Sequence, residues 1–119
     1  MNWYVCKIIY RIICGDGDHT AQFDEQLRLI EANDLLHAFN KARSTGKNEE
    51  DSFLNFVNKP VRWKFVDVVE IHPLNALVDG AEIYSKISEE VDGENYISFI
   101  QLRAAHLQES ATFQSPVLN

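Results

Sequence analysis

The sequence predicts an α+β protein with an antiparallel four-stranded sheet, two helices on one face of the sheet, and the element order ββαββα. Three observations lead to this fold class. Runs rich in β-branched and aromatic residues open each half of the chain. Two stretches with apolar residues at three- and four-residue spacing follow them. All five glycines fall at the predicted element boundaries, so the local signals agree with one another.

The first predicted strand covers residues 3–14, WYVCKIIYRIIC, which contain neither glycine nor proline. Its even-numbered positions are apolar throughout, whereas its odd-numbered positions place Lys7 and Arg11 among apolar residues. Because successive side chains of a strand point to opposite faces, both faces of this strand are largely apolar.

A glycine-rich turn at residues 15–18 joins this strand to a second predicted strand at residues 25–32. Leu27 and Leu29 share one face of the second strand, and the two strands form a predicted antiparallel hairpin. The turn reads GDGDH, which lacks the ligand spacing of a calcium loop, so we expect an ordinary polar turn without a metal.

The first predicted helix follows Asn33 and Asp34, two residue types that cap helix N-termini. Apolar residues then recur with helical spacing at Leu35, Ala38, Phe39 and Ala42. Gly46 stands where a C-terminal cap glycine is expected. Residues 48–58 allow two interpretations, a short helix with an acidic first turn or a packed loop.

The third predicted strand reads VRWKFVDVVEIH and lies between Pro60 and Pro73, which are allowed strand-end positions. A loop follows to residue 80, and residues 81–88 predict the fourth strand. The second predicted helix covers residues 96–107. Its apolar stripe consists of Ile97, Ile100, Ala104 and Leu107.

Residues 1–107 therefore form one predicted domain, and residues 108–119, which have little pattern, form a loosely ordered C-terminal tail. Each half of this domain contains a tryptophan-bearing strand, a second strand and a helix. A duplicated ββα unit is one interpretation of this likeness. The alternative is that any two hairpins followed by helices look this similar.

Composition excludes several classes of protein. The formal net charge is −7, from 18 acidic and 11 basic side chains, which disfavours nucleic-acid binding. No apolar run approaches the ~18 residues that cross a bilayer, and no signal peptide is recognisable, so we expect a cytoplasmic protein without membrane contact. Cys6 and Cys14 would lie roughly 26 Å apart on one strand, too far for a disulfide. No cofactor or catalytic motif is present, and we expect no cofactor.

The apolar character of both strand faces predicts a partner surface, because two helices cover only one face of the sheet. The C-terminal tail, a ligand groove or a second copy of the chain could cover the other face. Symmetric self-association is the commonest natural solution, so we expect a homodimer. The candidate interface residues are Trp3, Val5, Ile9, Ile13, Trp63 and Phe65.

Two functional hypotheses follow. The first is a non-enzymatic, homodimeric binding or interaction module, of which an acidic immunity-type protein with a basic protein partner is a sharper form. The second is a small-ligand-binding protein or minor enzyme with a pocket between the sheet and the loop at residues 73–80. His72, Asp79 and Glu82 are the candidate polar groups of that pocket.

Three segments, WYVCKIIYRI, PVRWKFVDVVEIHPL and DGAEIYSK, resemble a family of small bacterial proteins labelled only as a domain of unknown function. The resemblance covers roughly residues 2–90, and the segment after Gly93 is not part of it. It implies a stand-alone bacterial cytoplasmic domain. It supplies no substrate, cofactor or catalytic residue.

Overall fold

The computed structural model describes residues 1–54 and 58–114. The chain divides into two compact units, Met1–Ser85 and Lys86–Asn119, and each is described here by itself. The first unit holds the sheet and one helix, and the second holds a single long helix. The expectation of one domain over residues 1–107 stays a prediction.

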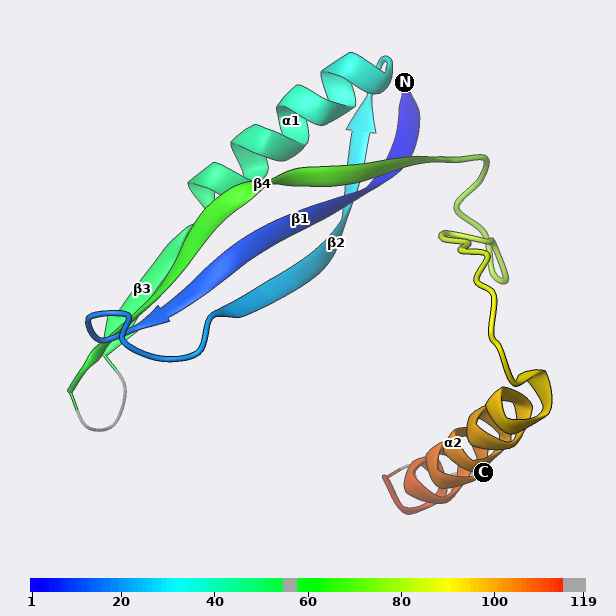
Figure 1. Cartoon of the computed structure of the whole chain (residues 1–119). Coiled ribbons are helices and arrows are strands. Elements are labelled where there is room, and N and C mark those ends of the chain that lie inside the picture. The colour runs from blue at the N-terminus through cyan, green and yellow to red at the C-terminus, as the bar shows by residue number, and fades with distance from the viewer. Residues whose placement is uncertain (55–57, 115–119) are drawn as a thin grey trace. The chain divides into compact units, whose positions relative to one another are not determined.

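The first unit is built on three long antiparallel strands, β1 (Asn2–Cys14), β2 (Gln22–Ala32) and β4 (Pro60–Leu74). β1 lies between the other two, and the short strand β3 (Asp51–Leu54) pairs with the beginning of β4. The strand order is β2-β1-β4-β3 (Figure 1). The α+β class and the antiparallel hairpin of β1 and β2 are therefore confirmed.

The predicted fourth strand at residues 81–88 is wrong, because this segment is neither helix nor strand. Tyr84 instead packs its ring against side chains on one face of the sheet. The short strand β3 extends the sheet instead. It lies within residues 48–58, where we expected a short helix or a packed loop. Residues 55–57 of that stretch lie outside the described residues. β3, β4 and α2 follow one another in the chain, so a second ββα order is present with other strands than the sequence predicted, and the duplication stays a prediction.

Helix α1 (Leu35–Asn48) begins at the predicted N-cap. The Asp34 carboxylate accepts a hydrogen bond from the backbone N–H of His37 at 2.8 Å. In return, the ring nitrogen Nδ1 of His37 accepts the N–H of Asn33 at 3.0 Å. The first bond satisfies a backbone donor of the first helical turn, and the second ties the residue before the N-cap to the helix, which is a variation on a capping box.

Gly46 is not the C-terminal cap that the sequence predicted, because α1 continues through Asn48 and ends at Glu49. Gly46 is buried where the helix crosses the sheet, and the hydroxyl of Tyr10 donates to its carbonyl at 2.7 Å. A Cβ at this position would lie 2.5 Å from a ring carbon of Phe65. A glycine therefore permits the close approach of α1 to the sheet.

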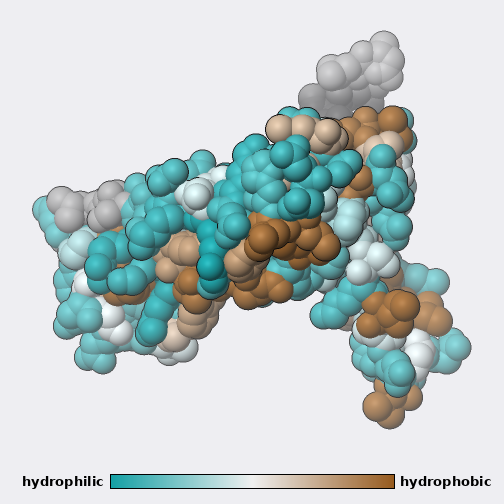
Figure 2. All heavy atoms as spheres, turned by 90° about the horizontal axis from the view of Figure 1, so that it is seen from above, coloured by the Kyte–Doolittle hydropathy of each residue, from teal (hydrophilic) through white to brown (hydrophobic). Residues whose placement is uncertain are grey.

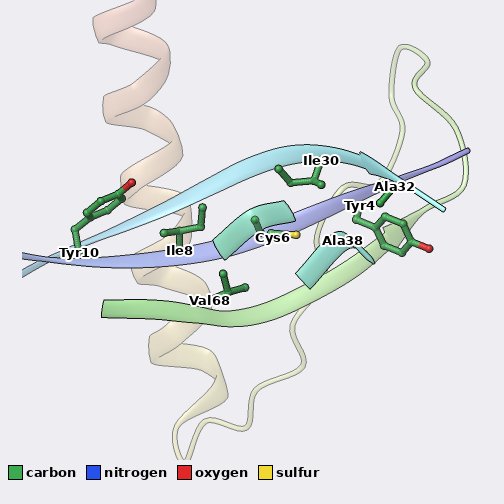
Figure 3. Packing of buried hydrophobic residues seen from close by; sticks show 9 residues of the cluster. Tyr4, Cys6, Ile8, Tyr10, Ile30, Ala32, Ala38 and Val68 are labelled. Atoms are coloured by element: carbon green, nitrogen blue, oxygen red, sulfur yellow. The ribbon is translucent and has the colours of Figure 1, made fainter. Parts of the chain in front are cut away.

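The core lies between α1 and the sheet and contains the even-numbered side chains of β1 that the sequence predicted to be apolar (Figure 3). It consists of Tyr4, Cys6, Ile8, Tyr10, Ile30, Ala32, Ala38, Ala42 and Val68. Ile8 and Cys6 are completely buried, and burial raises the pKa of the Cys6 thiol. The small residues of α1 bring the helix close to β1.

The second unit contains α2 (Gly93–Gln114), which is longer than the helix predicted at residues 96–107. It begins after Asp92, whose carboxylate accepts the N–H of Asn95 at 3.0 Å. Residues 108–114 are helical, so the predicted loose tail is wrong there, and residues 115–119 lie outside the described residues. In the described part of the chain, neither helix combines the length and the hydropathy that crossing a bilayer requires.

Candidate functional site

The side of the sheet away from α1, which we call the open face, is the candidate functional surface. Since the even-numbered residues of β1 pack toward α1, its odd-numbered residues lie on the opposite side. Four of the six candidate interface residues are among them, namely Trp3, Val5, Ile9 and Ile13. The structure therefore brings these four together along one strand.

The edge strand β2 adds three apolar side chains to the open face. Phe23, Leu27 and Leu29 are 54%, 49% and 50% exposed. Leu29 lies opposite Val5 in the β1–β2 register, but Val5 is buried with 4% of its surface exposed, so the exposed apolar side chains here are those of β2. The sequence placed Leu27 and Leu29 on one face of the strand. Their alternation with charged residues was the signal that could have identified them as candidate interface residues. Hydrophobic patches interrupt the hydrophilic surface elsewhere too, as the view from above shows (Figure 2).

Trp63 and Phe65 do not lie on the open face, although they were expected to share the interface. They pair with Ile12 and Tyr10 of β1 and pack against the core. Two register shifts between β1 and β4 let side chains of both parities on β4, such as Phe65 and Val68, turn toward α1. The six candidate residues are therefore divided between two faces of the sheet.

A cluster of charged and aromatic side chains lies on the open face where β1 and β4 meet. Lys7 Nζ is 2.9 Å from Glu70 and 3.9 Å from Glu25, and His72 Nε2 is 2.9 Å from the other Glu70 oxygen. The Tyr84 ring lies over this group, with its centroid 5.5 Å from Lys7 Nζ and 5.1 Å from the His72 ring centroid. The segment before residue 85 therefore covers part of the open face.

Lys7 and Glu70 stabilise each other's charged forms. The hydrogen bond from Lys7, followed by the bond with His72, lowers the pKa of the Glu70 carboxyl. The same bond to Glu70 raises the pKa of the Lys7 ammonium. Both groups are therefore charged at neutral pH, so Lys7 is not a free amine base and Glu70 is not a proton donor.

We expect the Glu70→Gln variant to flatten the acid side of the pH–stability profile. Because the pKa of folded Glu70 is lowered, its ion pair stabilises the folded chain above the ordinary glutamate pKa, and this stabilisation is lost as the pH falls through the lowered value. Urea unfolding of both proteins, from neutral pH to about pH 3, measures the difference. If the free energy of unfolding of both proteins falls equally with pH, the ion pair of Lys7 and Glu70 contributes nothing to stability.

Two of the three candidate pocket residues line the same hollow in the surface. His72 and Glu82 line one hollow of about 200 Å³, together with Tyr84. Asp79 does not line this hollow and lies in the turn before Gly80, whose φ is +83°. The hollow is smaller than the ~300–1,000 Å³ of typical small-molecule sites.

In the polar hairpin turn between β1 and β2, side chains accept hydrogen bonds from backbone N–H groups of the same turn. Asp16 accepts the N–H of Asp18 at 3.0 Å, and His19 Nε2 accepts the N–H of Cys14 at 2.9 Å. Within residues 1–54 and 58–114, no three His, Cys, Asp or Glu side chains are grouped to hold a metal ion.

On the α1 side, β2 carries a hydrogen-bonded row of side chains. Asp24 accepts from Trp63 Nε1 at 3.1 Å and from the Gln26 amide at 2.7 Å. Arg28 donates to the Gln26 oxygen at 2.7 Å and forms a 2.6 Å ion pair with Glu49. These contacts hold the charged side chains of β2 in fixed positions.

Comparison with known proteins identifies a family for most of the chain. The family model described as Domain of unknown function (DUF4288) matches residues 3–85. No curated protein and no solved structure matches the chain. The matched segment ends at residue 85, where the first compact unit ends, and it covers more than half of the 119 residues. The resemblance inferred from the sequence is thereby confirmed, and the chain belongs to the family of domains of unknown function DUF4288.

Proposed function

We propose that this chain is a non-enzymatic binding module that acts as a homodimer and uses the open face of its sheet as the working surface. The observation that carries this proposal is the exposure of Phe23, Leu27 and Leu29, each about half exposed on a face that α1 does not cover. Exposed apolar side chains that gather along one strand are a common mark of an interaction surface.

Two-fold symmetry doubles the apolar area that self-association can bury. Burying the exposed half of a leucine or phenylalanine side chain contributes about 1 kcal/mol. A two-fold contact buries these three side chains on both copies of the chain. Together they can offset a large part of the free-energy cost of association. The open face is therefore better suited to a second copy than to a small molecule.

The charged groups support binding rather than catalysis. Lys7, Glu70 and His72 are paired with one another. The hollow beside His72 and Glu82, which the alternative of a small-ligand protein would use, holds only about 200 Å³. These contacts and this size favour the interaction module over the ligand-binding alternative.

The net charge of −7 supports a basic protein as the further partner of the module, which is the immunity-type form of the proposal. The open face carries acidic side chains, Glu25 and Glu31, beside its apolar residues. Free thiols at Cys6 and Cys14 support a reducing, cytoplasmic compartment.

We expect Leu29→Glu to weaken self-association by more than about tenfold, since two carboxylates would enter each interface. Leu29 is 50% exposed, so the free energy of unfolding of the protomer should change by less than about 1 kcal/mol. Sedimentation velocity measures the association, and circular dichroism shows whether the variant is folded.

Leu36→Glu is the matched control, because Leu36 is 69% exposed on α1 and not on the open face. This variant should associate like the unmodified chain. Equal association of the Leu29→Glu and Leu36→Glu proteins would contradict the proposed use of the open face.

A further inference from the structure

The outer edge of β2 is open for pairing. β2 stands at the end of the strand order, and in the described part of the chain no strand pairs with it on the side away from β1 (Figure 1). The edge runs over eleven residues, Gln22–Ala32. Such an edge exposes a row of backbone donors and acceptors that another strand can use.

The direction of the backbone groups along β1 follows from two hydrogen bonds. The N–H of Gly15 donates to the carbonyl of Pro60 at 2.7 Å, toward β4. The N–H of the preceding residue, Cys14, donates to His19 in the hairpin loop that leads to β2. Odd-numbered residues of β1 therefore direct their backbone groups toward β4, and even-numbered residues direct theirs toward β2.

The same alternation applies to β2. The even-numbered residues of β1 lie opposite even-numbered residues of β2, such as Tyr4 opposite Ile30, so these face inward. The odd-numbered residues of β2 direct their N–H and C=O groups outward. The contact between Lys41 Nζ and the carbonyl of Glu31 at 2.8 Å agrees with this assignment and occupies that end of the edge. Residues 22–30 remain available.

The opposite edge of the sheet is closed to a further strand. β3 pairs with the beginning of β4. Beyond β3, the N–H of Phe65 donates to the Glu50 carboxylate and the N–H of Val68 donates to Asp67, both at 2.8 Å. Two bulges also distort this part of β4. Among the described strands, β2 is therefore the one that can accept a partner strand along its length.

We infer that a second copy of this chain adds its own β2 antiparallel to this edge, with the two-fold axis at Gln26. This inference rests on the proposed homodimer and specifies how it forms. In this register Asp24 lies opposite Arg28 of the second copy, and Arg28 lies opposite Asp24. Opposite charges in directly opposed strand positions are favourable, and here they occur twice.

The odd-numbered residues of β2 also pair in this register, and one of their two pairs is apolar on both sides. Phe23 lies opposite Leu29 of the second copy, and Glu25 lies opposite Leu27. The paired segment spans residues 22–30, which is the stretch that Lys41 leaves open. The cross-strand contact of Phe23 with Leu29 occurs twice in this dimer and covers part of both exposed side chains at the edge of the open face.

Other antiparallel registers are less favourable. An axis at Asp24, Glu25 or Arg28 would place that charge opposite its own copy. An axis at Leu27 would place Phe23 opposite Glu31, whose carbonyl is already occupied. The charge pattern of β2 and the occupied carbonyl of Glu31 together favour the axis at Gln26.

Disulfide cross-linking tests this register. Gln26→Cys, in a chain that also carries Cys14→Ser, places two thiols opposite each other at a position without hydrogen bonds between the strands. The Cα atoms there would be about 4.5 Å apart, within disulfide range. With oxidised glutathione present, we expect covalent dimers on non-reducing gels. Cys14→Ser alone is the background control.

Two matched variants fix the register. Asp24→Cys and Arg28→Cys should each remain monomeric on the gel when oxidised alone, because like positions would be about 13 Å apart. A mixture of the two should cross-link, since these positions oppose each other. Circular dichroism establishes that each variant is folded.

Sedimentation of the same proteins separates this inference from the proposed function. A non-covalent dimer in which Gln26→Cys does not cross-link would overturn the β2 pairing but leave the homodimer in place. A monomer in solution would overturn both. Self-linking of Gln26→Cys together with linking of the mixture supports both.

Discussion

Replacing Ile8 by alanine is expected to lower the free energy of unfolding by about 2–5 kcal/mol. Ile8 is fully buried at the middle of the central strand, between β2 and β4, and packs toward α1. Removing its outer carbons leaves a cavity that three strands and a helix cannot easily fill. Guanidinium unfolding at fixed protein concentration measures the loss, because a dimer's stability depends on concentration.

Val69→Ala is the control for this measurement. Val69 is 56% exposed on β4, so its truncation should change the free energy of unfolding by less than about 0.5 kcal/mol. Similar losses for Ile8→Ala and Val69→Ala would contradict the placement of the core between α1 and β1.

Replacing Gly46 by alanine is expected to destabilise the protein by about 1–3 kcal/mol. The new methyl group would lie 2.5 Å and 2.7 Å from ring carbons of Phe65 and 3.1 Å from Ile8 Cγ2. Alanine favours helices over glycine by about 1 kcal/mol, but displacing a packed ring or the whole helix costs more. The direction of the effect therefore distinguishes packing from helix propensity.

Ser44→Ala, an exposed site on the same helix, isolates the propensity term and should leave stability unchanged or slightly higher. The same guanidinium unfolding experiment measures both variants. A Gly46→Ala protein as stable as Ser44→Ala would mean that α1 does not approach the sheet as closely as the contacts of Gly46 require.

The parts of the fold that the sequence predicted are those with strong local signals. The periodicity of residues 3–14 placed β1 and its buried face, and Asp34 marked the start of α1. In contrast, the segment at 81–88 has strand-like residues but forms no strand, because pairing also requires an accessible edge. β4 does not offer one where bulges and the carboxylates of Glu50 and Asp67 occupy it.

The candidate site was predicted only in part. Alternation placed Trp3, Val5, Ile9 and Ile13 correctly on one face of β1. It could not decide which face of β4 meets α1, so Trp63 was nominated for the interface although it packs toward the core and donates to Asp24. The contact of Tyr84 with Lys7 joins residues far apart in the sequence, and no local pattern reports such a contact.

Sedimentation equilibrium of the unmodified chain at micromolar concentration tests most directly whether the uncovered side of the sheet joins two copies. We expect a species of twice the 13.7 kDa mass of one chain, which dissociates on dilution. A single-chain mass throughout the micromolar range would contradict self-association through the open face.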